Sequence, residues 1–415
     1  MIGPGLSLDQ APPFSVPLRF FLTAPWFLAA TGLLAAWLPA WVGDHLSPAA
    51  LALTHLVTLG FLGMVMLGAM TQMLPVVAGT QVPTTLPVST LSHLCLLLGT
   101  PLLAWGLASG KPWPLESAGV LLSLSLAVFA AAAATSLARG RALDTLRAMG
   151  VALSALITAL ALGLHLTGWL AGLWMPTDPL DWLARHVLAG LAGWIGILVM
   201  GTAWQVVPML QLTPPYPQRV TRSLLIAASA SLAAAILFPA PWRTLGEIGL
   251  SLVGIAFALV TLDLQRRRKR RIPDVGLSFW RLGMICLILS AILFPLPLPE
   301  PVLLLAGLLF LLGFAVSVAN GMLYKIVPFL AWFHLQAQKG IMARGLPSMK
   351  DYLPDTAATG QFLIHLAALA CLLGAPFQPM LAVPGGLLLA VSAAWLGRNL
   401  IRAVRLFHTH GGRFR

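Results

Sequence analysis

A chain of 415 residues, of which 59% are apolar and 9% are charged, differs sharply from a soluble domain, whose charged fraction is about 25%. Its mean hydropathy is +0.89. These values exclude a soluble globular protein and make the lipid bilayer its main solvent. Twelve spans of roughly 20 residues would occupy most of the chain, so no extramembrane catalytic domain is expected.

The cysteines and the net charge exclude two further classes. Cys95, Cys286 and Cys371 lie inside apolar runs, which argues against a disulfide framework and against a Cys-x-x-Cys metal site. The net charge of +13 comes from Lys and Arg at the ends of apolar segments rather than from one basic face. We therefore expect membrane lipid, and no nucleic acid, as the partner of these charges.

The apolar windows predict an all-α polytopic membrane protein with about twelve transmembrane helices. In chain order the windows are 17–42, 49–79, 87–109, 115–138, 144–173, 180–213, 219–239, 242–264, 277–296, 301–332, 357–376 and 378–403.

The loops between these windows predict the orientation. Alternate loops hold most of the basic residues, namely Arg139, Arg141 and Arg147, then Arg219 and Arg222, then the run Arg266 to Arg271, then Lys339, Arg344 and Lys350. The opposite loops hold only Lys111, Arg185 and Arg243. By the positive-inside rule both termini are cytoplasmic, and we expect a bacterial-type cytoplasmic (inner) membrane.

Helices 2, 6 and 10 share a glycine that precedes a proline by seven residues. The three stretches are Gly68–Pro75, Gly201–Pro208 and Gly321–Pro328, each about four helices from the next. This spacing predicts a single membrane domain of three four-helix repeats, roughly 17–138, 144–264 and 277–403. The recurrent proline is expected to end or bend each helix, and the glycine to allow close helix packing.

Three histidines lie where they could bind a metal. His55, His165 and His186 are each about five to eight residues inside the expected outer boundary of helices 2, 5 and 6, so they share one depth. An imidazole in hydrocarbon needs a partner, and a haem iron or a copper ion would satisfy it. The alternative is that each ring bonds a nearby carbonyl or water. His93 and His365 lie near the opposite boundary, and their role stays open.

The repeat does not relate these histidines to one another. Counted back from the repeat glycines, His55 is thirteen residues away and His186 is fifteen, so on regular helices they point about 200° apart. Leu308 stands on helix 10 where His55 would recur. A ring of three equivalent histidines is therefore not expected.

Polar residues do recur in the repeat. Gln72, Gln205 and Lys325 each follow the repeat glycine by four residues, near the cytoplasmic surface. One interpretation is a polar cluster around a pseudo-threefold axis that contacts a haem propionate or lines a water path. The other is that these side chains satisfy helix-end carbonyls or extend to the interface.

Other intramembrane chemistry is sparse. Glu116, Glu247 and Glu300 fall at outer helix edges or in loops, so no carboxylate is expected at mid-membrane, which argues against a proton pump or cation carrier. Four methionines of helix 2 could offer thioether ligands, but their spacing is typical of packing: Met64, Met66, Met70 and Met73.

Together these features resemble a known family. Twelve helices in three groups, the segment from His55 to Pro75 and a second histidine on helix 6 resemble the haem-copper oxidase subunit I-like superfamily, and within it the NnrS-like and cbb3-like relatives. The similarity spans the architecture of nearly the whole chain and the motifs of helices 2, 6 and 10. It implies haem, or secondly copper, as cofactor, an electron-transfer protein as partner, and respiratory redox chemistry or nitric-oxide handling.

The chain also departs from that family. Helix 7 lacks the adjacent histidines that bind copper in the oxidases, and helix 10 lacks their His-x-His, with His334 just beyond its predicted end. Val57 and Thr58 stand where NnrS-like proteins carry a second histidine and a glutamate. The resemblance therefore implies no complete haem-copper catalytic centre.

The sequence predicts an integral membrane protein that binds haem or copper, with His55 as the first ligand and His165 or His186 as the next. Gly60 and Gly63 are expected to leave room for a flat macrocycle beside His55. The rival prediction is a cofactor-free transporter or assembly component with structural histidines. Whether the protein is an enzyme stays open.

Overall fold

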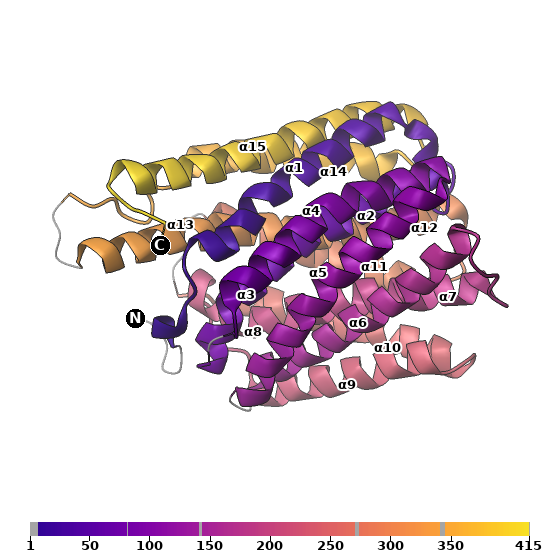
Figure 1. Ribbon diagram of the computed structural model, residues 1–415, viewed down its shortest axis with the longest axis horizontal. Helices are drawn as coiled ribbons and strands as arrows, with labels where there is room; N and C mark the ends of the chain where they lie inside the picture. Colours follow the sequence, from indigo (N-terminus) through magenta and orange to yellow (C-terminus); the bar gives the residue numbers. More distant parts are fainter. Residues whose placement is uncertain (1–6, 81, 141–142, 270–273, 341–344, 415) are drawn as a thin grey trace.

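The computed structural model describes residues 7–80, 82–140, 143–269, 274–340 and 345–414. In this part of the chain, 12 helices are long and apolar enough to cross a membrane, which confirms the predicted multi-pass all-helical class. They lie side by side in one bundle, and both chain ends lie at the same end of it (Figure 1). Of the basic residues that set the predicted orientation, Arg141, Arg270, Arg271 and Arg344 lie outside the described residues.

Nine of the described spans are built on one α-helix each. They are α1 (Ser15–Trp37), α4 (Thr85–Ser109), α5 (Pro112–Arg139), α6 (Asp144–Leu170), α9 (Gln218–Leu237), α10 (Trp242–Arg266), α11 (Val275–Leu293), α14 (Asp355–Gly374) and α15 (Ala382–Thr409). Short 3₁₀ turns supplement them at η1 (Leu8–Gln10), η2 (Pro39–Val42) and η6 (Pro379–Leu381).

The other three spans are composite, with a π-helical segment between two α-helices. The first composite helix joins α2 (Pro48–His55), η3 (Leu56–Gly63) and α3 (Met64–Ala78). The second joins α7 (Pro179–Val187), η4 (Leu188–Gly196) and α8 (Ile197–Gln211), and the third joins α12 (Glu300–Leu308), η5 (Leu309–Val316) and α13 (Ser317–Lys339). We call the end of the bundle where α2, α7 and α12 begin the α2 end.

The π segments keep the register of the sequence repeat. Each of them ends five residues before the repeat glycine, at Gly63, Gly196 and Val316. π-helical turns are rare and occur frequently at functional sites. The three composite helices therefore share a backbone irregularity as well as a sequence pattern.

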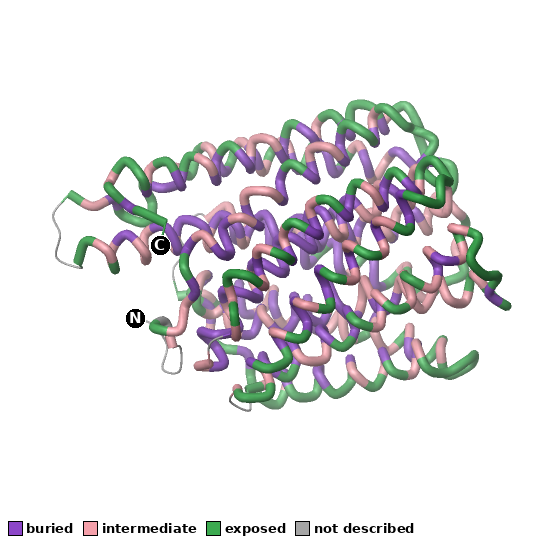
Figure 2. The backbone as a smooth tube through the Cα atoms, in the orientation of Figure 1, coloured by how far each residue is buried: buried purple, intermediate pink, exposed green. Residues whose placement is uncertain are grey.

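The composite helices form the inside of the bundle. In their most apolar windows 67%, 67% and 61% of residues are buried, against 28 to 56% in the other nine spans. The outer helices pack against one another around them, with α1 against α15, α4 against α5, α9 against α10 and α14 against α15. Figure 2 shows the same division, with exposed residues along the outer helices and buried ones within. A site between composite helices is consequently shielded by an outer layer.

The prolines of the repeat do not end these helices, so the first of the two expected effects, ending rather than bending the helix, does not occur. Pro75 and Pro208 lie inside α3 and α8, which continue for about one turn beyond them. Pro328 lies inside α13, which runs on to Lys339 and so includes His334. A membrane helix tolerates an internal proline because neighbouring groups can satisfy the freed backbone carbonyl.

Close backbone contact joins the first and last spans. A Cβ atom added at Gly32 of α1 would lie 2.5 Å from both the Ala390 nitrogen and the Gly386 oxygen of α15. Only a glycine fits such a contact, because these neighbours are backbone atoms that cannot rotate away.

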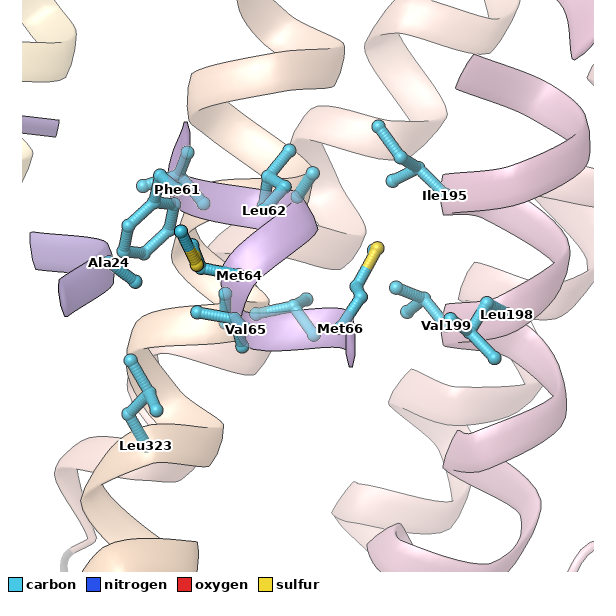
Figure 3. Close-up of a cluster of buried hydrophobic side chains, with 14 of the residues drawn as sticks. Ala24, Phe61, Leu62, Met64, Val65, Met66, Ile195, Leu198, Val199 and Leu323 are labelled. Carbon is cyan, nitrogen blue, oxygen red and sulfur yellow. The ribbon is translucent and has the colours of Figure 1, made fainter. Parts of the chain in front are cut away.

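The methionines of the first composite helix belong to the core. Met64 and Met66 are buried, and Figure 3 shows them in an apolar cluster with Phe61 and, across the bundle, Ile195 and Val199. Met66 extends toward the second composite helix in this view. Their surroundings are those of packing residues, the role that the sequence favoured.

Candidate functional site

Two of the three predicted histidine ligands meet between composite helices. His55 ends α2 and His186 lies in the last turn of α7, and their ring centroids are 6.1 Å apart with an interplanar angle of 21°. The pair meets although the two residues occupy different positions in the repeat. The difference of about 200° was calculated for regular helices, and the π segments η3 and η4, which lie between these histidines and the repeat glycines, change the rotation per residue.

Backbone hydrogen bonds orient both rings. The Nδ1 of His55 lies 2.8 Å from the Leu51 carbonyl oxygen, and the Nδ1 of His186 lies 2.9 Å from the Ala159 carbonyl oxygen on α6. A carbonyl only accepts, so each Nδ1 carries the proton and the lone pair of each neutral ring is on Nε2. Metal-binding histidines usually have this arrangement, with the second nitrogen fixed by an outer partner.

A glycine of α6 makes room for His186. A Cβ atom added at Gly163 would lie 3.0 Å from Cε1 and 3.4 Å from Nδ1 of the imidazole. The ring therefore lies directly against the α6 backbone, where it reaches the Ala159 carbonyl. Any larger side chain at position 163 would compete with the ring for this space.

The two rings are close neighbours and are stacked. Their planes are nearly parallel, at 21°, and their centroids are 6.1 Å apart. An imidazole binds a metal through the lone pair that lies in its ring plane, so a shared metal requires both Nε2 atoms to turn toward a common point between the helices. His55 and His186 thus place two candidate imidazole ligands, of the kind that haem iron and copper accept, beside each other.

His165, the third predicted ligand, has different neighbours. Its ring stacks on Trp174 at 5.8 Å and contacts Trp182 at 5.1 Å, and its backbone oxygen accepts a hydrogen bond from the Trp174 indole. Its buried Nε2 has no hydrogen-bond partner among the described residues. No ring contact joins it to His55 or His186 in the described part of the chain, so the structure does not bring the three predicted ligands together.

The room predicted beside His55 is filled at Gly60 by another helix. A Cβ atom there would lie 2.5 to 2.8 Å from the side chain of Phe27 on α1. The expectation that Gly60 leaves space for a flat macrocycle is therefore wrong, because the ring of Phe27 occupies the position a side chain would take. At Gly63 the nearest atom to an added Cβ is the Thr58 carbonyl oxygen of the same composite helix, at 3.2 Å.

The remaining intramembrane histidines have local partners. The Nε2 of His93 lies 2.9 Å from the Thr23 hydroxyl, and the Nε2 of His365 lies 2.8 Å from the Ser317 hydroxyl. His334 stacks on Phe14 at 5.4 Å. These contacts are typical of structural histidines. They agree with the alternative given above, in which a histidine ring is held by nearby groups of the protein rather than by a metal.

The repeated polar residues do not form a mutual hydrogen-bonded cluster within the described chain. Lys325 pairs with the Asp274 carboxylate at 2.7 Å, close to the start of α11. The same carboxylate accepts a hydrogen bond from the Gly276 amide in the first turn of that helix. Gln72 is buried, and its Oε1 has no partner among the described residues. Lys325 thus forms an ion pair at one helix end, and no hydrogen bond joins it to Gln205 among the described residues.

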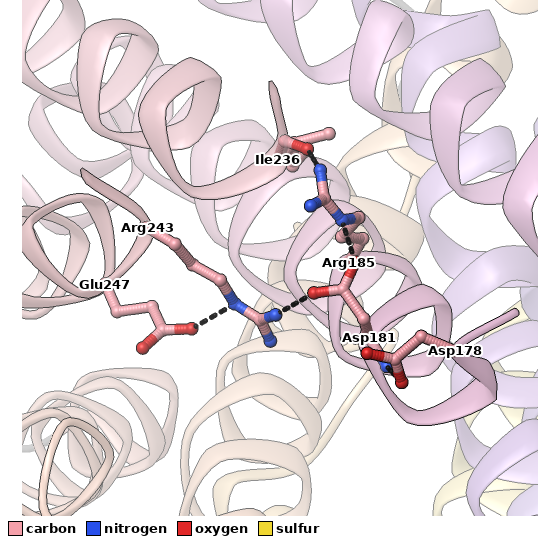
Figure 4. Close-up of polar contacts among 6 residues, drawn as sticks. All are labelled: Asp178, Asp181, Arg185, Ile236, Arg243 and Glu247. Atoms are coloured by element: carbon pink, nitrogen blue, oxygen red, sulfur yellow. Dashed lines mark hydrogen bonds and ion pairs between the residues drawn. The ribbon is translucent and has the colours of Figure 1, made fainter. Parts of the chain in front are cut away.

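An ion-pair network joins helices at the α2 end (Figure 4). Asp181 of α7 accepts from Arg185 at 2.7 Å and also pairs with Arg243 of α10, which bonds Glu247 at 3.1 Å. Arg185 in addition donates to the Ile236 carbonyl of α9. The network therefore ties the helix that carries His186 to α9 and α10.

We expect Arg243→Gln to loosen this attachment. The substitution leaves Glu247 unpaired and Asp181 with one partner, and removing one member of a partly buried ion pair leaves an uncompensated charge. The expected loss is about 1 to 2 kcal/mol of unfolding free energy, since the residues keep some contact with solvent. A thermal unfolding midpoint measured in detergent should fall, whereas Arg147→Gln, at a surface pair with Asp144, should leave it within error.

A large cavity lies between the composite helices toward the α2 end. Its volume is about 530 Å³, and its walls come from α2, α7, α12 and their π segments, with α10 and α11 behind them. Leu51, Leu183 and Leu191 are typical of its apolar lining. Neither His55 nor His186 lines it, although the wall residues Leu51 and Leu183 lie about one helical turn from them.

A histidine that the sequence analysis overlooked stands at this cavity. His45 precedes α2 and lines the cavity, and its Nδ1 lies 2.7 and 2.9 Å from the two carboxylate oxygens of Glu300, the first residue of α12. The His45 amide donates to the same carboxylate at 2.6 Å. Glu300 begins α12 and His45 shortly precedes α2, at the same end of the bundle. Their positions at the starts of two inner helices are the sequence signal that could have predicted this contact.

The side chains around His45 also offer ligand atoms for a cation. Those of Asp44, His45 and Glu300 lie within 4.8 Å of one another, but Asp44 is exposed and the His45 Nδ1 is already bonded to Glu300. The hydrogen bond accounts for this grouping without an ion.

Comparison with known proteins adds no family assignment. No family model matches the chain, and no curated protein matches it. The class of protein therefore rests on the fold, a twelve-helix membrane bundle, and the function on the two histidine sites.

Proposed function

We propose that this membrane protein binds one redox metal centre between His55 and His186, either a haem iron or a copper ion. The observation that carries the proposal is the pair itself: two neighbouring imidazoles from different inner helices, stacked at 6.1 Å, with both Nδ1 atoms at backbone carbonyls. Binding one metal requires the rings to turn so that both Nε2 atoms face it. An imidazole pair held in this way presents two Nε2 lone pairs, which are the ligands that both metals accept.

The contacts near the pair bear on the choice between the two metals. A copper(I) ion needs only the two nitrogens, whereas a porphyrin also needs a flat space, and Phe27 fills the space beside Gly60. The cavity that begins at Leu51 and Leu183 is the nearest apolar space for a macrocycle edge. The resemblance to the haem-copper oxidase superfamily favours haem. The packing at Gly60 favours copper, which needs less space.

Either metal would supply one-electron chemistry, while the protein positions it. The backbone carbonyls of Leu51 and Ala159 keep the rings in the ligand tautomer. Such a centre suits respiratory electron transfer or nitric-oxide handling, with an electron-transfer protein as partner. The end of the bundle that holds both chain termini then lies on the cytoplasmic side of a bacterial-type inner membrane, as the positive-inside rule predicts.

The test is an optical spectrum and a metal analysis of the purified full-length protein. A Soret band that shifts on reduction identifies haem, and about one copper per chain without that band identifies copper. A featureless spectrum with neither metal, after expression with added haem precursor and copper, would contradict the proposal. That result would favour the rival function of a cofactor-free transporter or assembly component.

A further inference from the structure

We infer that the central cavity is a second binding site, for a lipid-soluble molecule that presents a hydroxyl group to His45. A volume of about 530 Å³ lies within the range of small-molecule sites, about 300 to 1,000 Å³. Such sites combine mostly apolar walls with a few polar groups that set the orientation of the ligand. This site is distinct from the metal pair, since neither His55 nor His186 belongs to its wall.

The walls select an apolar ligand body. They are formed mainly by leucine, alanine and phenylalanine side chains, and two of the hydroxyls in the wall are already engaged. Thr31 donates to the Phe27 carbonyl and Ser290 donates to the Ala306 carbonyl, each at 2.8 Å. Burial of apolar surface stabilises binding by about 25 cal/mol per Å², so an aliphatic or isoprenoid chain would bind there with a hydrophobic gain.

His45 supplies the polar contact. A carboxylate only accepts hydrogen bonds, so the Nδ1 of His45 carries the proton that Glu300 receives, and in the neutral form of the ring the lone pair is on Nε2. His45 belongs to the cavity wall, whereas Glu300 does not. We assign the remaining ring nitrogen to the ligand, and a hydroxyl donor, from an alcohol or a phenol, is the head group that such an acceptor recognises.

The carboxylate also fixes the ring in place. Glu300 accepts hydrogen bonds from both the amide and the side chain of His45 and thereby joins the start of α2 to the start of α12.

The cavity wall itself contains the acid Glu247, which is paired with Arg243. Thr54 and Ser251 add hydroxyls to the wall, and His45 is the one imidazole in it.

The test compares ligands that differ in the hydroxyl. Decylhydroquinone and its dimethyl ether share the ring and the apolar tail, the ether is larger by two methyl groups, and only the hydroquinone can donate a hydrogen bond. We expect decylhydroquinone to bind the purified full-length protein saturably and the ether to bind about tenfold more weakly. Hexadecanol serves as the second source of the same chemistry, and tighter binding of either hydroxyl compound supports the site and identifies phenol or lipid alcohol as its ligand.

Variants locate the binding. His45→Ala, and His45→Phe as a ring-preserving form, should remove the preference for decylhydroquinone over the ether. Leu250→Trp should fill the cavity and abolish binding of both, while Leu252→Trp on the exposed face of the same helix should not. His186→Ala should leave this binding intact, which separates the site from the metal centre.

Three results would overturn the inference. They are the absence of saturable binding of either hydroxyl compound to the wild-type protein, equal affinity for hydroquinone and ether, and a hydroxyl preference that survives in both His45 variants. Each can occur whether or not a metal is found between His55 and His186, so failure here is distinguishable from failure of the proposed function.

Discussion

With the proposed metal centre in place, His186→Ala is expected to bind metal at least tenfold more weakly than the wild-type protein, with little change in the helical content. The substitution removes one of two ligand nitrogens, and loss of even an outer partner of a ligand typically costs 10- to 100-fold in metal affinity. His55→Ala should have the same effect, because the two rings contribute one ligand each. Metal per protein, measured on monodisperse samples, reports the result.

Two further variants make this prediction specific. Gly163→Val should lower metal content although it changes no ligand, since even its Cβ would lie 3.0 Å from the His186 ring. His165→Ala is the matched control, because that ring packs between Trp174 and Trp182 and contacts neither ligand. Full metal content in the His186→Ala protein, or equal loss in the His165→Ala protein, would contradict the assignment of the pair.

Gly32→Leu should destabilise the whole bundle more than any other single change discussed above. The added Cβ would approach two backbone atoms of α15 to 2.5 Å, so α1 and α15 would have to separate along their contact. Overpacking typically costs about 1 to 3 kcal/mol, and the upper end is expected where the neighbour is backbone. The thermal unfolding midpoint in detergent should fall markedly.

Gly150→Leu is the control for that experiment. Gly150 lies within α6, and nothing lies within 4 Å of a Cβ added there. Leucine favours the helix over glycine by nearly 1 kcal/mol, so the midpoint should stay constant or rise slightly. If the Gly32 and Gly150 variants unfolded at the same temperature, the close contact between α1 and α15 would be wrong.

The sequence was sufficient to predict the twelve helices because a bilayer imposes a length on every apolar run. The windows 49–79, 180–213 and 301–332 correspond to the three composite helices, and α13 ends later than the third window. The π segments could not be predicted, since a wider turn leaves no characteristic pattern in a continuously apolar run. Nor could the filling of Gly60 by Phe27, which depends on how α1 packs.

The candidate site was predictable in part. Equal depth marked His55 and His186 as neighbours, because depth follows from residue count along a helix. The same reasoning included His165, whose ring instead contacts two tryptophans of the connecting segment and α7, a tertiary contact that residue counting does not reveal. His45 was overlooked because it lies between apolar windows, where the partner Glu300, 255 residues away, cannot be inferred from local pattern.

The π segments have a consequence for how such a protein can change by insertion and deletion. A π turn accommodates one more residue than an α turn, so losing one residue from η3 could return it to regular helix. On a regular α-helix one residue corresponds to about 100° of rotation, and the wider turn absorbs that rotation, so His55 would keep roughly its orientation relative to Gly68. Single-residue steps within such a segment can thus change the length of the helix while the histidine half and the glycine half both stay in register.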